Sequence, residues 1–161
     1  MPESGAPTAR GAGFAALLLD SHLRLVGVPL VPRMWGDAEE AARWLYEEAP
    51  FGLLAHDNSK DPRFVYANRT AQRCFGYTEE EFTRLPSRLS AAPDAQEDRD
   101  AFVAAVNRQG FADGYRGRRV RKNGSHFWIE DVRMWNLVDA DGHKHGQAAL
   151  FGSWSDVTAA S

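Results

Sequence analysis

The chain has 161 residues, 43% of them hydrophobic and 25% charged, with a formal net charge of −3 at pH 7. This length fits one domain with a substantial core, and the mild acidity gives no reason to expect nucleic acid as an obligatory partner. Cys74 is the only cysteine, which excludes an internal disulfide or a cysteine-ligated metal cluster and favours a reducing compartment. The longest apolar run, Phe14 to Leu19, is too short to cross a membrane. We therefore expect a cytoplasmic protein.

The N-terminal part of the chain predicts a tail and two helices. Residues 1–11 are rich in Gly, Pro and Ala and are expected to be disordered. Apolar residues recur at helical spacing over 12–26, after which Gly and Pro end the pattern. A second helix is expected over 37–49, with Asp37 as its N-cap. Because each helix has an apolar side, we expect this extension, residues 12–49, to cover the outer face of a sheet.

Short strands and helices alternate in the middle of the chain. Strands are expected over 51–57 and from Phe64, and Asn68 stands where the second strand turns into a helix. Thr78 and Glu81 have the spacing of a capping box, which predicts the start of another short helix.

A longer helix and three strands complete the chain. The helix is expected over 94–110, with Asp94 as its N-cap. Asn123-Gly124 is a strong hairpin signal and a further turn follows, so the strands are expected over 111–122, 125–138 and 146–156. This order of elements predicts an α+β fold with an antiparallel sheet.

The segment from Phe64 to Pro86 reads FVYANRTAQRCFGYTEEEFTRLP and resembles the core of a PAS domain. The resemblance lies in the Tyr-Ala-Asn at the strand end, the Phe-Gly-Tyr turn, the glutamates and the Leu-Pro. LPSRLSA over 85–91, FWIEDV over 127–132 and WNLVD over 135–139 are similar to the MEKHLA family, a PAS-like group. The resemblance covers about residues 20–158.

This resemblance implies a PAS-like fold. Its five-stranded antiparallel sheet would carry short helices and one long helix on one face, after the two N-terminal helices. The PAS-like MEKHLA core would span residues 50–158, followed by a short tail, 159–161. Such a domain would be a sensory or protein-interaction module with an internal pocket. It would bind a small ligand, a partner protein or both, and signal by conformational change or dimerisation.

The PAS-like register implies which side chains face the pocket. Alternation along the fourth strand would turn Phe127, Ile129, Asp131, Arg133 and Trp135 inward. A polar molecule held by His56, Tyr66, Asp131 and Arg133 is the sharpest ligand hypothesis. The full set of expected ligand-binding residues is Leu54, His56, Tyr66, Asn68, Ser87, Ile129, Asp131, Arg133 and Trp154. The alternative is a bulge that turns Asp131 and Arg133 to solvent while Val132 and Met134 enter the core.

The identity of any cofactor is left open by the sequence. Ser87 stands where flavin photoreceptor PAS domains carry their reactive cysteine, and Ile129 and Trp154 replace amide side chains expected at the flavin edge. These departures disfavour a covalent flavin adduct. Haem is also disfavoured, because the helix over 94–110 contains no histidine. His143 and His145 are interpreted as solvated turn residues, so no metal site is expected.

Output is expected through a separate signalling protein, a homodimer or the N-terminal helices. The outward face of the fourth strand, formed by Trp128, Val132 and Met134, is the expected contact surface. Two other functions stay open. One is a small-molecule-processing enzyme that uses the same pocket, with Asp131 as base, although no catalytic constellation is evident. The other is a nucleic-acid-associated protein that binds through the basic run Arg116–Lys122, for which a solvated strand face is the favoured interpretation.

Overall fold

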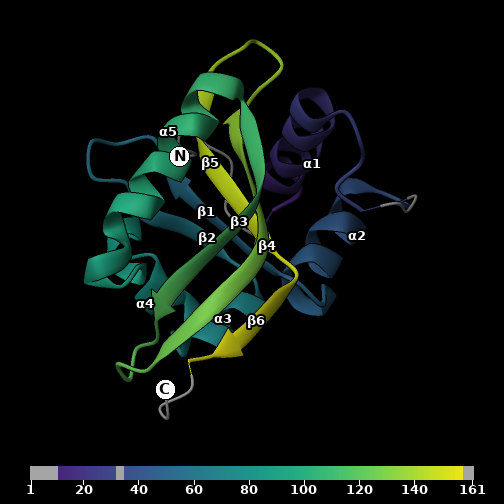
Figure 1. The fold of residues 1–161 in the computed structure, drawn as a ribbon. Coiled ribbons are helices and arrows are strands. Elements are labelled where there is room, and N and C mark those ends of the chain that lie inside the picture. The colour runs from purple at the N-terminus through teal and green to yellow at the C-terminus, as the bar shows by residue number, and fades with distance from the viewer. Residues whose placement is uncertain (1–10, 32–34, 158–161) are drawn as a thin grey trace.

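The computed structural model describes residues 11–31 and 35–157 and has an α+β fold in which one sheet separates two groups of helices (Figure 1). The first helix, in purple, lies against one face, and the long helix, in green, lies on the opposite side. The tails expected at 1–11 and 159–161 lie outside the described residues, apart from Gly11. None of the helices in the described ranges is long and apolar enough to span a membrane.

The helices match the sequence expectations closely. They are α1 (Ala12–Val26), α2 (Ala38–Arg43) with a π-helical turn at Trp44–Glu48, α3 (Arg69–Phe75), α4 (Glu79–Phe82) and α5 (Gln96–Gln109), with 3₁₀ turns at Ser87–Ser90 and Pro93–Ala95. The capping box of Thr78 and Glu81 is formed. In contrast, α5 begins after Asp94, because the Asp94 carboxylate pairs with Arg118 and does not cap the helix.

The sheet contains one strand more than expected. Its strands are β1 (Gly52–Asp57), β2 (Phe64–Ala67), β3 (Phe111–Val120), β4 (His126–Val138), β5 (Lys144–Phe151) and β6 (Ser153–Asp156). The order is β2-β1-β5-β4-β3, with β6 beside β4, and the pairings are antiparallel. The last predicted strand is divided at Gly152, so β5 pairs with the second half of β4 and β6 with the first.

A bulge in β4 reverses which side chains face each side of the sheet. Asp131 has a φ of 53° and is exposed. In the pairing of β3 with β4, Tyr115 lies opposite Val132 and Gly117 lies opposite Ile129. One residue separates the pair in β3 and two separate it in β4, so β4 has one extra residue there. Because side chains alternate along a strand, one extra residue turns every later side chain to the other face.

The bulge corrects the predicted register. Phe127 and Ile129 face inward as expected, but the next inward-facing side chains of β4 are those of Val132 and Met134. The inward orientation predicted for Asp131, Arg133 and Trp135 is therefore wrong, and the alternative with a bulge is confirmed for Val132 and Met134. For the same reason Val132 and Met134 do not form the predicted outward contact surface. Only Trp128 of that set lies on the outer face, where the Arg116 guanidinium stacks 3.7 Å from its ring centre.

The N-terminal helices cover the outer face of the sheet, as predicted, and this is the face on which Trp135 lies. Phe14 and Leu18 of α1 belong to the same buried cluster as Leu45 and Trp135. The Ser21 hydroxyl also fastens α1 to the end of β4, donating to the Val138 carbonyl (2.8 Å) and accepting from the Val138 amide (2.9 Å). The second half of β4, around Trp135 and Leu137, is consequently buried under α1.

His22 joins α1 to the side chain that the bulge turns outward. Its Nδ1 donates to the Val28 carbonyl (2.8 Å), so its Nε2 accepts from Arg133 Nη1 (3.3 Å). The imidazole is fully buried and lies edge-on to Trp135. Burial, and then the positive charge of Arg133, lower the pKa of His22 below its ordinary value of 6.5.

The positive φ at Asp131 makes a prediction for stability. Glycine adopts this backbone without strain, whereas a β-branched residue does not. Asp131→Gly should keep or raise the free energy of unfolding, by up to about 1 kcal/mol, and Asp131→Val should lower it by about 1–2 kcal/mol. Urea denaturation measures both. An equal loss in the two variants would show that the carboxylate, and not the backbone, matters at this position.

His22 predicts a pH dependence of folding. Because its pKa is lower in the folded chain, the unfolded chain binds more protons below about pH 6.5. The free energy of unfolding should therefore be highest above that pH and fall as the solution is acidified. His22→Gln should make this fall shallower in urea titrations between pH 8 and 5. An unchanged slope in His22→Gln would contradict the assignment.

Candidate functional site

A narrow cavity lies between the inner face of the sheet and a wall formed by α5 and the 3₁₀ turn Ser87–Ser90. Its larger apolar side chains are Leu54, Phe64, Phe102, Val103, Ile129, Val132, Met134 and Phe151. Its polar side chains are His56, Ser87, Ser90, Arg99, Tyr115, Arg119 and Gln147. The centre of a water molecule can reach about 50 Å³ of this space. The cavity in this conformation thus has room for only a few non-hydrogen atoms.

His56 presents a hydrogen-bond acceptor that has no donor. Its Nδ1 lies 2.9 Å from the Asp57 carbonyl oxygen, and because a carbonyl only accepts, Nδ1 carries the proton of the neutral ring. The other ring nitrogen, Nε2, is buried and has no hydrogen-bond partner among the described residues. Burial lowers the pKa of His56, and the charge of Arg99 lowers it further. The side chain is only 7% exposed, so Nε2 is a buried acceptor at the cavity.

Tyr115 presents a second unpartnered group. Its hydroxyl is buried and makes no hydrogen bond with the described residues. The ring is held by stacking on Phe102 of α5, with ring centres 4.3 Å apart. Gly117 makes room for it, because a Cβ at that position would lie 2.6 Å from the tyrosine oxygen. Neither residue was among the predicted site residues; their signal in the sequence is the aromatic-x-glycine alternation on the inward face of β3.

Two arginines complete the polar part of the cavity. Arg99 of α5 donates from Nη2 to the Ser87 hydroxyl (2.7 Å) and pairs through Nη1 with Asp100 (3.2 Å). Arg119 of β3 is 8% exposed and donates to the Arg118 carbonyl (3.2 Å). Burial, and then the charge of Arg119, lower the pKa of Arg99. Each guanidinium therefore raises the electrostatic cost of burying the other.

The nine predicted ligand-binding residues separate into two groups. Leu54, His56, Ser87 and Ile129 line the cavity. Tyr66, Asn68, Asp131, Arg133 and Trp154 do not, and the first two are buried elsewhere. Asp131 is exposed and Arg133 faces His22, as the bulge requires. Trp154 is 38% exposed and packs edge-on against Phe151.

Tyr66 and Asn68 contact other parts of the fold and not the cavity. A register shift in the β1–β2 pairing sets Tyr66 opposite Ala55 but Phe64 opposite His56. Tyr66 consequently faces α1, where it stacks on Phe14 at 5.3 Å. Asn68 is fully buried, and its carboxamide accepts from the amides of Ala71 and Leu53 and donates to the carbonyls of Leu45 and Phe51, at 3.0–3.1 Å. Its role is to cap α3 and tie it to β1 and the π-helical turn.

The basic run Arg116–Lys122 is matched by carboxylates. Arg116 pairs with Glu130 (2.9 Å) and Arg121 with Asp156 (2.7 Å). Arg118 and Lys122 pair with Asp94 and Glu81. Arg119, the remaining arginine of the run, points toward the cavity. These pairs favour a solvated strand face over a surface that presents its charge to phosphates.

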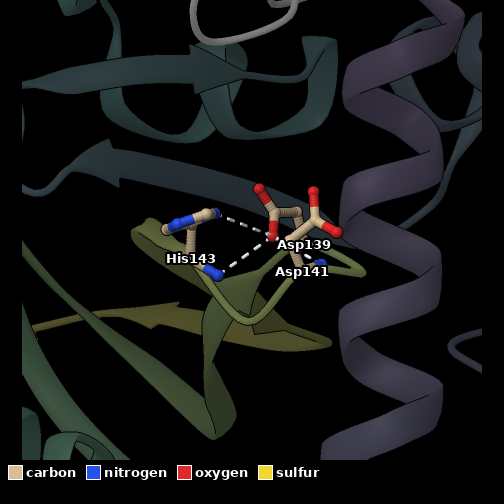
Figure 2. Close-up of side chains that lie close together, drawn as sticks. All are labelled: Asp139, Asp141 and His143. Carbon is tan, nitrogen blue, oxygen red and sulfur yellow. Dashed lines mark hydrogen bonds and ion pairs between the residues drawn. The ribbon is translucent and has the colours of Figure 1, made fainter.

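The hairpin turn between β4 and β5 brings Asp139, Asp141 and His143 together (Figure 2). Asp139 Oδ1 accepts from the amides of Asp141 and His143, both at 2.9 Å, and Oδ2 lies 2.8 Å from His145 Nε2. The hydrogen bond with His145, followed by that from His143, lowers the pKa of Asp139 to about 2. His145 is therefore paired and not simply solvated. The carboxylate already serves to close the turn, which accounts for the cluster without a cation.

Three solved structures have a similar fold. The PAS domain of a protein from Colwellia psychrerythraea is 20% identical, with a TM-score of 0.56 over 68% of this chain and 88% of that one. A light-oxygen-voltage domain studied with a flavin analogue is 20% identical, with a TM-score of 0.55 over 67% of this chain and 78% of that one. A blue-light activated histidine kinase of Erythrobacter litoralis is 19% identical, with a TM-score of 0.56 over 71% of this chain but 35% of the kinase.

These similarities establish a PAS-like fold, as the sequence analysis predicts, and at such identities they establish the fold alone. No curated protein matches the chain. The MEKHLA domain matches residues 12–156, a range that includes the N-terminal helix α1 as well as the sheet and the cavity. The chain therefore belongs to the MEKHLA domain family.

Proposed function

We propose that this MEKHLA domain is a sensory module that binds a small molecule in the cavity between the sheet and α5. The observation that supports it is the pair of buried, unpartnered atoms at the cavity, His56 Nε2 and the Tyr115 hydroxyl. Leaving a buried polar group without a hydrogen bond costs about 1–3 kcal/mol. A bound molecule that pairs with both groups would recover this free energy.

The contacts of Arg99 suggest how binding would be transmitted. Its guanidinium joins α5 to Ser87 in the 3₁₀ turn, and both segments form one wall of the cavity. A ligand that contacts Arg99 would compete with the Ser87 hydroxyl and shift the relative populations of the wall's conformations. The changed wall, or the outer face around Trp128, would then contact a signalling protein or a second copy of the chain.

Binding without turnover accounts better for the cavity than catalysis does. Among the described residues that line it there is no carboxylate and no thiol. Asp131, the base required by the enzyme hypothesis, is exposed at the bulge and outside the cavity. His56 could accept a proton, but the serine hydroxyls of the cavity make other hydrogen bonds: Ser87 accepts from Arg99, and Ser90 donates to the Ser87 carbonyl. A base with no nucleophile hydrogen-bonded to it gives weak support to a reaction.

Native mass spectrometry and thermal shift with a metabolite library test the proposal. We expect a bound small molecule, or compounds that raise Tm by several degrees. Val103→Trp fills the cavity and should abolish both signals. Ala104→Trp, at the next and exposed position of α5, is the matched control and should preserve them. The proposal fails if no compound binds, or if Val103→Trp binds as well as the control does.

A further inference from the structure

The polar groups of the cavity differ in what they require from a ligand. From their arrangement we infer that the ligand is a short-chain carboxylate that also carries a hydroxyl group. This inference rests on the proposed function, because it specifies the molecule that the sensory cavity takes. It is carried by four residues that line the same cavity: the partly buried Arg99, the buried Arg119, and His56 and Tyr115, whose Nε2 and hydroxyl are buried without a partner among the described residues.

The positive charges of Arg99 and Arg119 favour an anionic ligand. In the described parts of the chain, no carboxylate lies within ion-pair distance of Arg119, which is 8% exposed. Among the described residues Arg99 has one carboxylate partner, Asp100, whose side chain is 68% exposed and therefore screened by water. The cavity wall thus holds more positive than negative charge, at a cost in desolvation. A carboxylate would offset this cost, and its two oxygens suit the parallel N–H groups of a guanidinium.

His56 favours a ligand that also has a hydrogen-bond donor, such as a hydroxyl group. Neutral His56 exposes only an acceptor, Nε2, because its proton is on Nδ1 facing the Asp57 carbonyl. A carboxylate also has only acceptors, so a simple acid would leave Nε2 without a donor. A hydroxyl group of the ligand can donate to Nε2. The Tyr115 hydroxyl can donate in turn to the carboxylate, so that both unpartnered atoms are satisfied.

The size and the walls of the cavity limit the rest of the ligand. Water centres reach about 50 Å³, which restricts the ligand to a few non-hydrogen atoms. Between the polar groups the lining is apolar and includes Phe64, Ile129 and Met134. This part of the lining suits a short hydrocarbon group and offers no partner to a second charged group. A hydroxy acid of two or three carbons, with about five or six non-hydrogen atoms, is the largest that meets these conditions.

Calorimetric titration of the full chain with three matched probes tests the inference. Lactate has both groups, propionate lacks the hydroxyl and lactamide lacks the charge. We expect lactate to bind at least tenfold more tightly than either of the others. Binding of lactamide or propionate as tightly as lactate would overturn the inference, and this comparison needs no variant.

Substitutions then assign the groups. Arg99→Gln and Arg119→Gln should each weaken lactate binding at least tenfold, while Arg108→Gln, at an exposed position of α5, should leave it unchanged. His56→Leu should reduce the preference for lactate over propionate to about twofold or less. Unchanged lactate binding in both cavity variants would overturn the inference.

The two proposals can fail separately. If native mass spectrometry finds a molecule without a carboxylate in the cavity, the sensory function stands and the inference is wrong. If the protein carries no small molecule and binds no compound of the library or the lactate series, both are wrong.

Discussion

The bulge at Asp131 is the constraint on which the rest of the structure depends. One extra residue in β4 changes which side chains meet α5 and which meet α1. Without it, alternation would place Arg133 in the cavity and leave Val132 under the N-terminal helix. With it, the cavity receives a mainly apolar lining from β4, and Arg133 meets the imidazole of His22. The positive charges of the cavity come instead from α5 and β3.

Because α1 and the π-helical turn share a buried cluster with one face of the sheet, the N-terminal helices are part of the folded unit. Trp135 is fully buried under α1. Detaching α1 would expose this side chain to water, which is unfavourable. The detached α1 would itself be only marginally stable as a helix, because it has 15 residues. Asn68 connects the same layer to the core through four hydrogen bonds of one carboxamide. The match of the MEKHLA domain from residue 12 agrees with this arrangement.

Local chemistry made much of the fold predictable. The limits of α1, the capping box at Thr78 and the Asn123-Gly124 turn follow from rules that act within a few residues. The bulge could be named only as an alternative, since aspartate is one of several residues that tolerate positive φ. Arg99 and Arg119 were missed because an arginine on a polar helix or in a basic strand is ordinarily solvated. Only the packing of α5 on β3 buries Arg119 and partly buries Arg99.

The placement of charge also suggests why the domain could be responsive as well as stable. Arg99 and Arg119 stand on opposite walls of the cavity, on α5 and β3, and each raises the cost of the other's burial. Their repulsion favours separation of the two walls, whereas an anion between them would favour approach. The hydrogen bond from Arg99 to Ser87 couples the position of α5 to the 3₁₀ turn that borders the cavity. Under the proposed function, a singly charged anion would therefore act on α5, β3 and the 3₁₀ turn together. Its higher affinity for the arrangement in which the two walls lie closer would supply the signal.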